Sequence, residues 1–261
     1  MQRVRTMRRR WLVSLLVTIG CGDDTAPEAG DPEGKDDGGG VSGFAEVDPY
    51  HSSATFRRYV EAAIVMLERD PSQLARQTAM AIRQRRIHID ELVDLTCWDF
   101  ERARKDVPEA GLEPADYHHL HDRGSRVAKA LTGALDGYMW SNRVYVARGQ
   151  PVRRLAATLV HEINHVINRS EIGYYDDLPT SAFVHEYRAF YVESLFDPEA
   201  YAGIDLRDHV IETYALDRTK IRPAVLREPL TPLLVPDAAA WAARRVRDDP
   251  RDVDAKCPAN L

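Results

Sequence analysis

The chain has 261 residues, a formal net charge of -6 at pH 7 and a hydrophobic content of 44%. This length and composition are sufficient for one globular domain with a sizeable core. The acidic balance argues against nucleic acid or an anionic lipid surface as the natural partner.

The first twenty residues have the pattern of an export signal. Five arginines lie within residues 3–10, and they precede an apolar stretch that is too short for an ordinary transmembrane helix. The following Thr18-Ile19-Gly20-Cys21 resembles a bacterial lipobox, although Thr18 stands where Leu is usual. The resemblance implies cleavage before Cys21, lipidation of its thiol and anchoring in the bacterial cell envelope, in the periplasm or at the cell surface. The alternative is an ordinary secretory signal whose cysteine is incidental.

Residues 21–43 are rich in Gly, Asp, Glu and Pro and contain almost no large apolar side chains. Such a segment cannot bury enough surface to fold, so we expect a flexible acidic tether. Removal of residues 1–20 changes the formal charge from -6 to -11 because only the five arginines are charged there. Residues 44–261 show no internal repeat or second linker and are expected to form one domain.

The first half of this domain is predicted to be mainly helical. Apolar residues recur at helical spacing in residues 53–69, which predicts a helix there. Residues 71–85 and 116–135 are also expected to be helical. Residues 86–90 alternate between apolar and polar side chains, like a short strand. Residues 91–105 are ambiguous. In residues 137–147, Val144 and Val146 alternate with Arg143 and Tyr145, which predicts a strand, the second arm of a hairpin turning at residues 141–142. This strand is either the edge to which a peptide adds main-chain hydrogen bonds or an ordinary sheet strand.

Residues 151–170 are predicted to form a helix that carries His161-Glu162-Ile163-Asn164-His165, the pattern HExxH. Pro151 suits the first helical position, and Leu155 and Leu159 begin an apolar face. Residues four apart lie on the same face of a helix, so His161 and His165 can bind one metal ion. Glu162 then lies beside that ion, where a carboxylate can act as general base toward a metal-bound water. A chance match is the alternative, but two bare imidazoles on a buried helix are costly without a metal.

A zinc site needs a third protein ligand, and the candidates lie in residues 180–196. Thr180 or Ser181 is expected to cap a helix there, and the Asp197-Pro198 step is expected to end it. Glu186 and Glu193 are seven residues apart and share a helical face, so one can bind the metal while the other supports it. The third histidine of the metzincin pattern is missing, since Glu171 stands at that position.

Together these segments resemble the gluzincin type of zinc metallopeptidase, in which HExxH on one helix is completed by a Glu on the next. The resemblance covers residues 143–197 and implies a mixed α+β, zincin-like fold, mostly helical, with a small sheet whose edge strand precedes the HExxH helix. Family spacing favours Glu186 as the third ligand. Glu193 is the alternative, because the Asp that some gluzincins have four residues after the ligand is present for Glu193, as Asp197, and absent for Glu186. The resemblance further implies a bound Zn²⁺, a peptide or protein substrate, and Glu162 as the residue that passes the proton of the water to the leaving amine.

Such an enzyme also needs a hydrogen-bond donor for the oxyanion of the transition state. The sequence does not choose among the five candidates, which are Tyr174, Tyr175, His185, His209 and Tyr214. Farther along, residues 205–215 and 238–246 are predicted to be helical, with a proline-rich segment between them.

The chain has three cysteines. If Cys21 carries lipid, Cys97 and Cys257 remain as a possible disulfide in an oxidising compartment. One buried and one exposed free thiol is the alternative.

Three hypotheses for the function follow. The first is a tethered zinc metallopeptidase, and the second is a catalytically silent envelope lipoprotein that uses the same fold for binding. The third is a zinc hydrolase of non-peptide substrates, because HExxH indicates an activated water and not the bond that is cut. An intact His161, Glu162 and His165 favours an enzyme, since a silent protein does not need the general base.

Overall fold

The computed structural model describes residues 53–84, 87–140, 143–171 and 178–227. The expected signal segment, the tether with Cys21, the helix at residues 238–246 and Cys257 lie outside these ranges. Cys97 is buried and disulfide-bonded, and its pairing with Cys257 stays a prediction. Within the described ranges, no helix combines the length and hydrophobicity that crossing a membrane requires.

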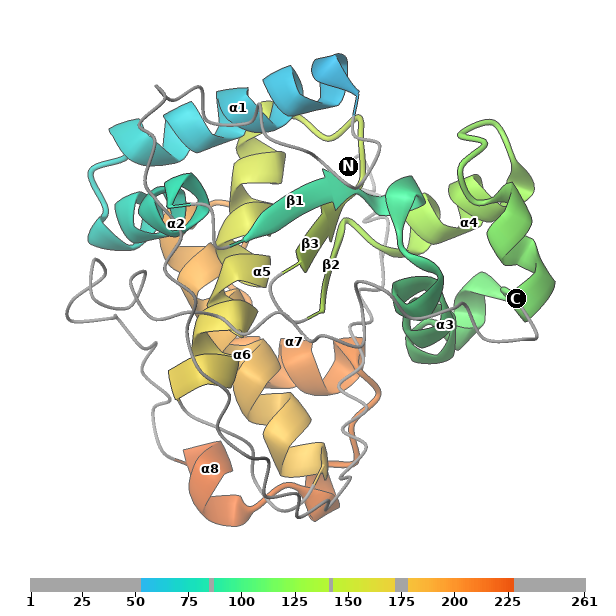
Figure 1. Cartoon of the computed structure of the whole chain (residues 1–261). Coiled ribbons are helices and arrows are strands. Elements are labelled where there is room, and N and C mark those ends of the chain that lie inside the picture. Colours follow the sequence, from blue (N-terminus) through green and yellow to red (C-terminus); the bar gives the residue numbers. More distant parts are fainter. Residues whose placement is uncertain (1–52, 85–86, 141–142, 172–177, 228–261) are drawn as a thin grey trace, which may run out of the picture.

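The described chain is mostly helical, with a small mixed sheet, and therefore belongs to the α+β class (Figure 1). Its elements in chain order are α1 Ala54–Arg69, α2 Gln73–Arg83, β1 His88–Glu91, η1 Leu92–Asp94, α3 Cys97–Asp106, η2 Pro108–Ala110, η3 Pro114–His119, α4 Arg126–Ala134, β2 Gly137–Trp140, β3 Arg143–Val146, α5 Val152–Glu171, α6 Leu178–Phe196, α7 Leu206–Thr213, η4 Arg218–Lys220 and α8 Pro223–Arg227.

Local sequence signals explain most helix starts. Side chains at the N-caps of five described α-helices accept a hydrogen bond from a backbone N–H of the first turn, and these residues are Ser53, Ser72, Thr96, Ser125 and Asp205. Two predicted boundaries were wrong. Helix α5 begins one residue after Pro151, and α6 begins at Leu178, so Thr180 and Ser181 lie inside the helix. Thr180 instead accepts a hydrogen bond from the backbone N–H of Arg222, at 3.0 Å, and so holds the segment before α8.

The described strands form one sheet in the order β1-β3-β2. β1 is parallel to β3, whereas β2 and β3 form the predicted antiparallel hairpin, with Trp140 opposite Arg143. The strand that directly precedes the HExxH helix, β3, is therefore central and not at the edge. The two outer strands of the described sheet are β1 and β2, and β2 is the first arm of the hairpin.

Helices cover both faces of this sheet. Val144 and Val146 of β3, with Met139 of β2, face a core formed with α1, α2 and α5. Because side chains alternate along a strand, Tyr138 and Tyr145 face the other way, into a second core with α3 and α4. Figure 1 shows this arrangement, with α3 and α4 on the side away from α5.

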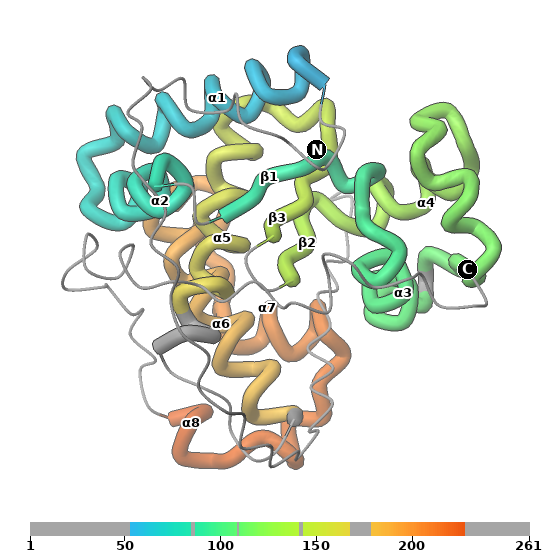
Figure 2. The backbone as a smooth tube through the Cα atoms, viewed as in Figure 1, coloured from blue at the N-terminus to red at the C-terminus, as the bar shows by residue number. Residues whose placement is uncertain are grey.

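Helix α6 packs along α5, and α7 packs against α6 (Figure 2). A third apolar cluster, which includes Phe183, Phe190, Val210 and Tyr214, joins α6 to α7 and the segment that follows. Helix α5 therefore lies between the sheet and α6, and residues on its two sides can reach both β2 and α6.

Candidate metal centre

Helix α5 carries the HExxH residues into the interior of the protein. Leu155, Leu159 and Ile163 are completely buried in the core beneath the sheet. His161, Glu162 and His165 are also buried, with exposed fractions of 0%, 0% and 1%. A helix with ionisable groups this deeply buried requires partners for each of them.

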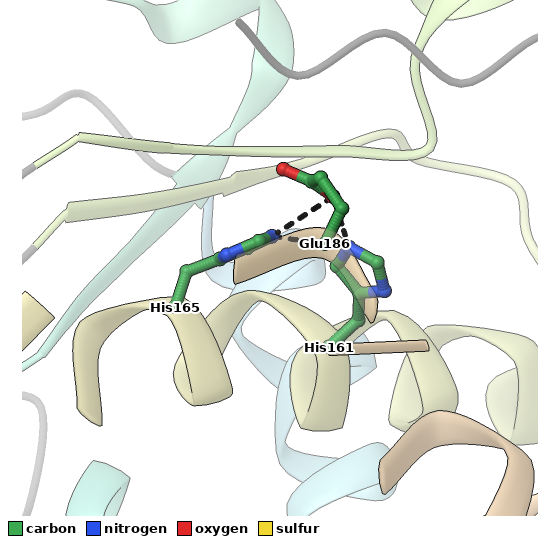
Figure 3. Close-up of side chains that lie close together, drawn as sticks. All are labelled: His161, His165 and Glu186. Atoms are coloured by element: carbon green, nitrogen blue, oxygen red, sulfur yellow. Dashed lines mark hydrogen bonds and ion pairs between the residues drawn. The ribbon is translucent and has the colours of Figure 1, made fainter. Parts of the chain in front are cut away.

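Glu186 of α6 completes a group of three buried ligand atoms (Figure 3). The Nε2 atoms of His161 and His165 are 3.2 Å apart. Oε2 of Glu186 lies 3.5 Å from Nε2 of His161 and 3.4 Å from Nε2 of His165. The three atoms thus form a nearly equilateral triangle that joins two helices. Lone pairs directed at one another at these distances repel unless a proton or a cation lies between them.

The dimensions of this triangle fit zinc. Two ligand atoms at zinc–nitrogen and zinc–oxygen bond lengths, separated by a tetrahedral angle, are about 3.3 to 3.4 Å apart. In an octahedral site with similar bond lengths, adjacent ligands would be only about 3.0 Å apart. Two imidazoles and one carboxylate also favour a transition ion over Mg²⁺ or Ca²⁺, which prefer oxygen ligands.

Glu193 lies on the opposite side of the His161 ring. Its Oε2 is 2.9 Å from Nδ1 of His161, the nitrogen that faces away from Glu186. The structure therefore groups Glu186 with the two histidines and places the alternative ligand, Glu193, behind one of them. A proton on Nδ1 is donated to Glu193, which leaves Nε2 directed at the triangle.

Glu162 is the third buried carboxylate of the centre, beside Glu186 and Glu193. Neither of its oxygens has a hydrogen-bond partner among the described residues. Strand β2 approaches it closely at Gly137, where a Cβ atom would lie 2.6 Å from Oε1 of Glu162. A buried carboxylate without a hydrogen bond is energetically costly, and such groups occur where chemistry requires them.

The charges of the centre shift the pKa values of its members. Burial lowers the pKa of His161, but Glu186 and Glu193 outweigh burial and raise it to about 10. Burial raises the pKa of Glu162 to about 7, against the opposing effect of the two histidines. For Glu186, burial acts upward, yet His165 and His161 hold the pKa at about 2.

Of the five candidate oxyanion donors, Tyr214 is the one whose pKa is raised by the charges of the carboxylates of this centre. Its hydroxyl is buried beside the Glu186 carboxylate, and burial, the charge of Glu186 and a hydrogen bond to Glu186 raise its pKa well above the usual value. His209 instead packs edge-on against Phe190, with ring centroids 4.8 Å apart. His185 is buried in α6, and Tyr174 and Tyr175 lie outside the described residues.

The sequence reasoning missed two residues of the surroundings, Gly137 and Arg154. A glycine in a strand often marks a site where another group approaches the backbone closely, so the sequence could have indicated Gly137. Arg154 carries no such signal, because an arginine in the first turns of a helix is usually a surface residue. Its role depends on partners from β2 and α6 that only the fold brings together.

Comparisons of the chain with protein-family models, with curated proteins and with solved structures returned no match.

Proposed function

We propose that this chain is a zinc-dependent metallopeptidase of the zincin type, similar to the gluzincins. The observation that carries the proposal is the combination of three convergent buried ligand atoms with a second buried carboxylate beside them. A structural metal site uses four protein ligands, whereas a catalytic site keeps a position open. Three ligands and an adjacent general base favour catalysis.

Each residue then has a defined task. His161, His165 and Glu186 would hold the ion, and Glu193 would orient His161 through Nδ1. Bound zinc supplies a Lewis acid that polarises a carbonyl and acidifies a water molecule. Glu162 accepts the proton of the attacking water at a carboxylate oxygen and delivers it to the leaving nitrogen. The absence of a competing hydrogen bond in the described chain leaves both of its oxygens free for this transfer.

The hairpin supports a peptide as the substrate. In an antiparallel pair, residues alternate between those whose N–H and C=O face the partner strand and those whose groups face away. The backbone N–H of Ala147 donates to the carbonyl of Asp136 at 2.8 Å, and by alternation the groups of Gly137 and Met139 point away from β3. Since β2 is an outer strand of the described sheet, these groups can pair with an extended peptide directly beside Glu162.

The gluzincin likeness rests on residues supplied by two successive helices. HExxH lies on α5 and Glu186 on α6, as the resemblance implies. The departure from the family is at Phe190, where an Asp four residues after the ligand is common. Glu193 replaces that Asp functionally, because it reaches the histidine from one helical turn farther along α6.

We also propose that the protein is exported and anchored to the bacterial envelope through lipid on Cys21. The support is the pattern of residues 1–21 together with the disulfide at Cys97. Disulfides persist in oxidising compartments and are rare in reducing ones. An acidic tether at residues 21–43 would hold the domain away from the membrane.

Metal analysis of the purified full chain tests the proposed function. We expect about one zinc per chain, lost in Glu186→Ala and retained in Glu162→Gln. Glu162→Gln should lower peptidase activity about 10²- to 10⁴-fold, the usual contribution of a general base. A chain that binds zinc but cleaves no peptide before or after this substitution would instead be a silent binding protein or a hydrolase of other substrates. A metal-replete chain without zinc would refute the metal centre.

A further inference from the structure

Arg154 connects two parts of the candidate centre that come from different elements. It lies on α5, two helical turns before His161, and its side chain is 26% exposed. Its Nη1 contacts Oε1 of Glu193 on α6, whose side chain is completely buried. Its Nε and Nη2 both lie 3.4 Å from Oδ2 of Asp136, the residue before β2. One guanidinium therefore bridges two carboxylates that are far apart in the sequence.

Both carboxylates lead to the chemistry. Glu193 contacts Nδ1 of His161 at 2.9 Å. Asp136 directly precedes Gly137, where the edge strand meets Glu162. The backbone carbonyl of Asp136 also accepts hydrogen bonds from the N–H of Ala147 and from Nε2 of Gln150, at 2.8 and 2.9 Å. The start of β2 is thus fixed between the sheet and the first turn of α5.

We infer that Arg154 is a positioning residue that couples the orientation of His161 to the position of the edge strand β2. A guanidinium is rigid and planar, so its orientation is set by both carboxylates together. When Asp136 is replaced by asparagine, the guanidinium loses the carboxylate on the β2 side and keeps its partners around Glu193, among them the hydroxyl of Tyr201. Glu193 then shifts relative to His161. A change at this ion-paired Arg154 guanidinium then alters both the metal affinity and the peptide binding of the centre. This inference rests on the proposed function, because it assigns Arg154 a role toward that metal and that substrate.

Zinc affinity of the full chain provides a test that does not require peptidase activity. We would measure it by competition with a chromogenic chelator for the parent and for Asp136→Asn, Glu193→Gln and the double variant. Loss of a side chain that supports a metal-binding histidine costs about 10- to 100-fold in affinity, and we expect this for Glu193→Gln. Asp136→Asn should lower zinc affinity roughly tenfold although Asp136 contacts no ligand. The double variant should lose less affinity than the product of the two single fold-losses, because both substitutions act through the same guanidinium.

Arg153→Gln is the matched control. Arg153 is the neighbouring arginine on α5 and also pairs with a carboxylate of the α6 segment, Asp197, at 3.1 Å, but its side chain is 54% exposed. Surface pairs of this kind contribute little to stability, and zinc affinity should stay within about twofold of the parent. The Co²⁺-substituted proteins supply a second readout: Asp136→Asn should change the visible spectrum of the bound ion, which a purely structural defect elsewhere does not.

Three results would overturn the inference. They are a zinc affinity of Asp136→Asn equal to that of the parent, a loss in the double variant equal to the product of the two single losses, and an effect of Arg153→Gln as large as that of Asp136→Asn. Unfolding curves of every variant separate a loss of coupling from a loss of fold. A parent chain without zinc would overturn the proposed function as well, whereas equal zinc binding by all variants would overturn the coupling alone.

Discussion

Replacement of Gly137 by alanine tests whether β2 and Glu162 are packed as tightly as the structure indicates. The added Cβ would lie 2.6 Å from Oε1 of Glu162, 2.7 Å from Cγ2 of Thr158 and 2.9 Å from Cγ of Glu162. Ordinary contacts begin at 3.4 Å, so the carboxylate or the strand must retreat by about 0.8 Å. Gly137 does not have a positive φ, and the effect therefore comes from the clash and not from backbone strain.

Two consequences of different size are expected from Gly137→Ala. Overpacking of a core costs about 1 to 3 kcal/mol of unfolding free energy, which corresponds to roughly 2 to 4 °C in Tm per kcal/mol for a domain of this size. A catalytic group displaced by about 1 Å loses roughly 10²-fold in rate, so kcat should fall by between one and two orders of magnitude. Zinc content should be unchanged because Gly137 does not contact His161, His165 or Glu186.

Two further variants separate the clash with Thr158 from the clash with Glu162. Thr158→Ser removes Cγ2 and keeps the hydroxyl, which donates at 2.9 Å to Gln150. Combined with Gly137→Ala, it should restore part of the stability but not the rate. Gly133→Ala is the control, since a Cβ there meets nothing within 4 Å on exposed α4, and it should be neutral or stabilising by about 0.5 to 1 kcal/mol. Wild-type kcat and Tm in Gly137→Ala would refute the close approach.

Four other outcomes are expected. Tyr214→Phe should retain zinc and KM and lower kcat about 10²-fold if the hydroxyl donates to the oxyanion; unchanged steady-state kinetics would exclude it. Zinc removal by a chelator should lower the Tm, because ligands on α5 and α6 would share the ion. The expected loss of unfolding free energy is about 4 kcal/mol when free zinc had been about 1,000 times the Kd. In differential scanning calorimetry, the Tm of Glu186→Ala should not change when the chelator is added. Ala215→Gly should stabilise the chain by about 0.5 to 1 kcal/mol in urea denaturation, because φ of Ala215 is 49° at the end of α7, a conformation that costs L-residues energy; destabilisation would contradict this. Asp99→Ala should cost about 3 to 5 kcal/mol, measured in the same way, since buried Asp99 faces the guanidinium of buried Arg143 at 3.3 Å. A cost in unfolding free energy below about 1 kcal/mol would show that other groups compensate the buried charge of Arg143.

Local signals determined the helices and the two histidines of the centre. The serine and threonine caps and the helical spacing of apolar residues are properties of short segments, and they predicted α1, α2, α5 and α6 to within a few residues. The i, i+4 spacing of His161 and His165 places both on one helical face in any fold that keeps the helix. Boundaries were less accurate, as at Thr180 and Ser181, because the residues that end or extend a helix compete with contacts from distant segments, here the backbone of Arg222.

The tertiary structure decided what no local pattern contains. Glu186 and Glu193 share a helical face, and only the packing of α6 on α5 places one at Nε2 of the histidines and the other at Nδ1. In the described sheet β3 is central and β2 is an outer strand, because β1 and β2 pair with the two sides of β3. Gly137 and Arg154 acquired their places through the same packing, since each contact joins elements whose relative position depends on the whole core. Sequence alone thus determined which residues can bind a metal, and the fold determined which of them meet.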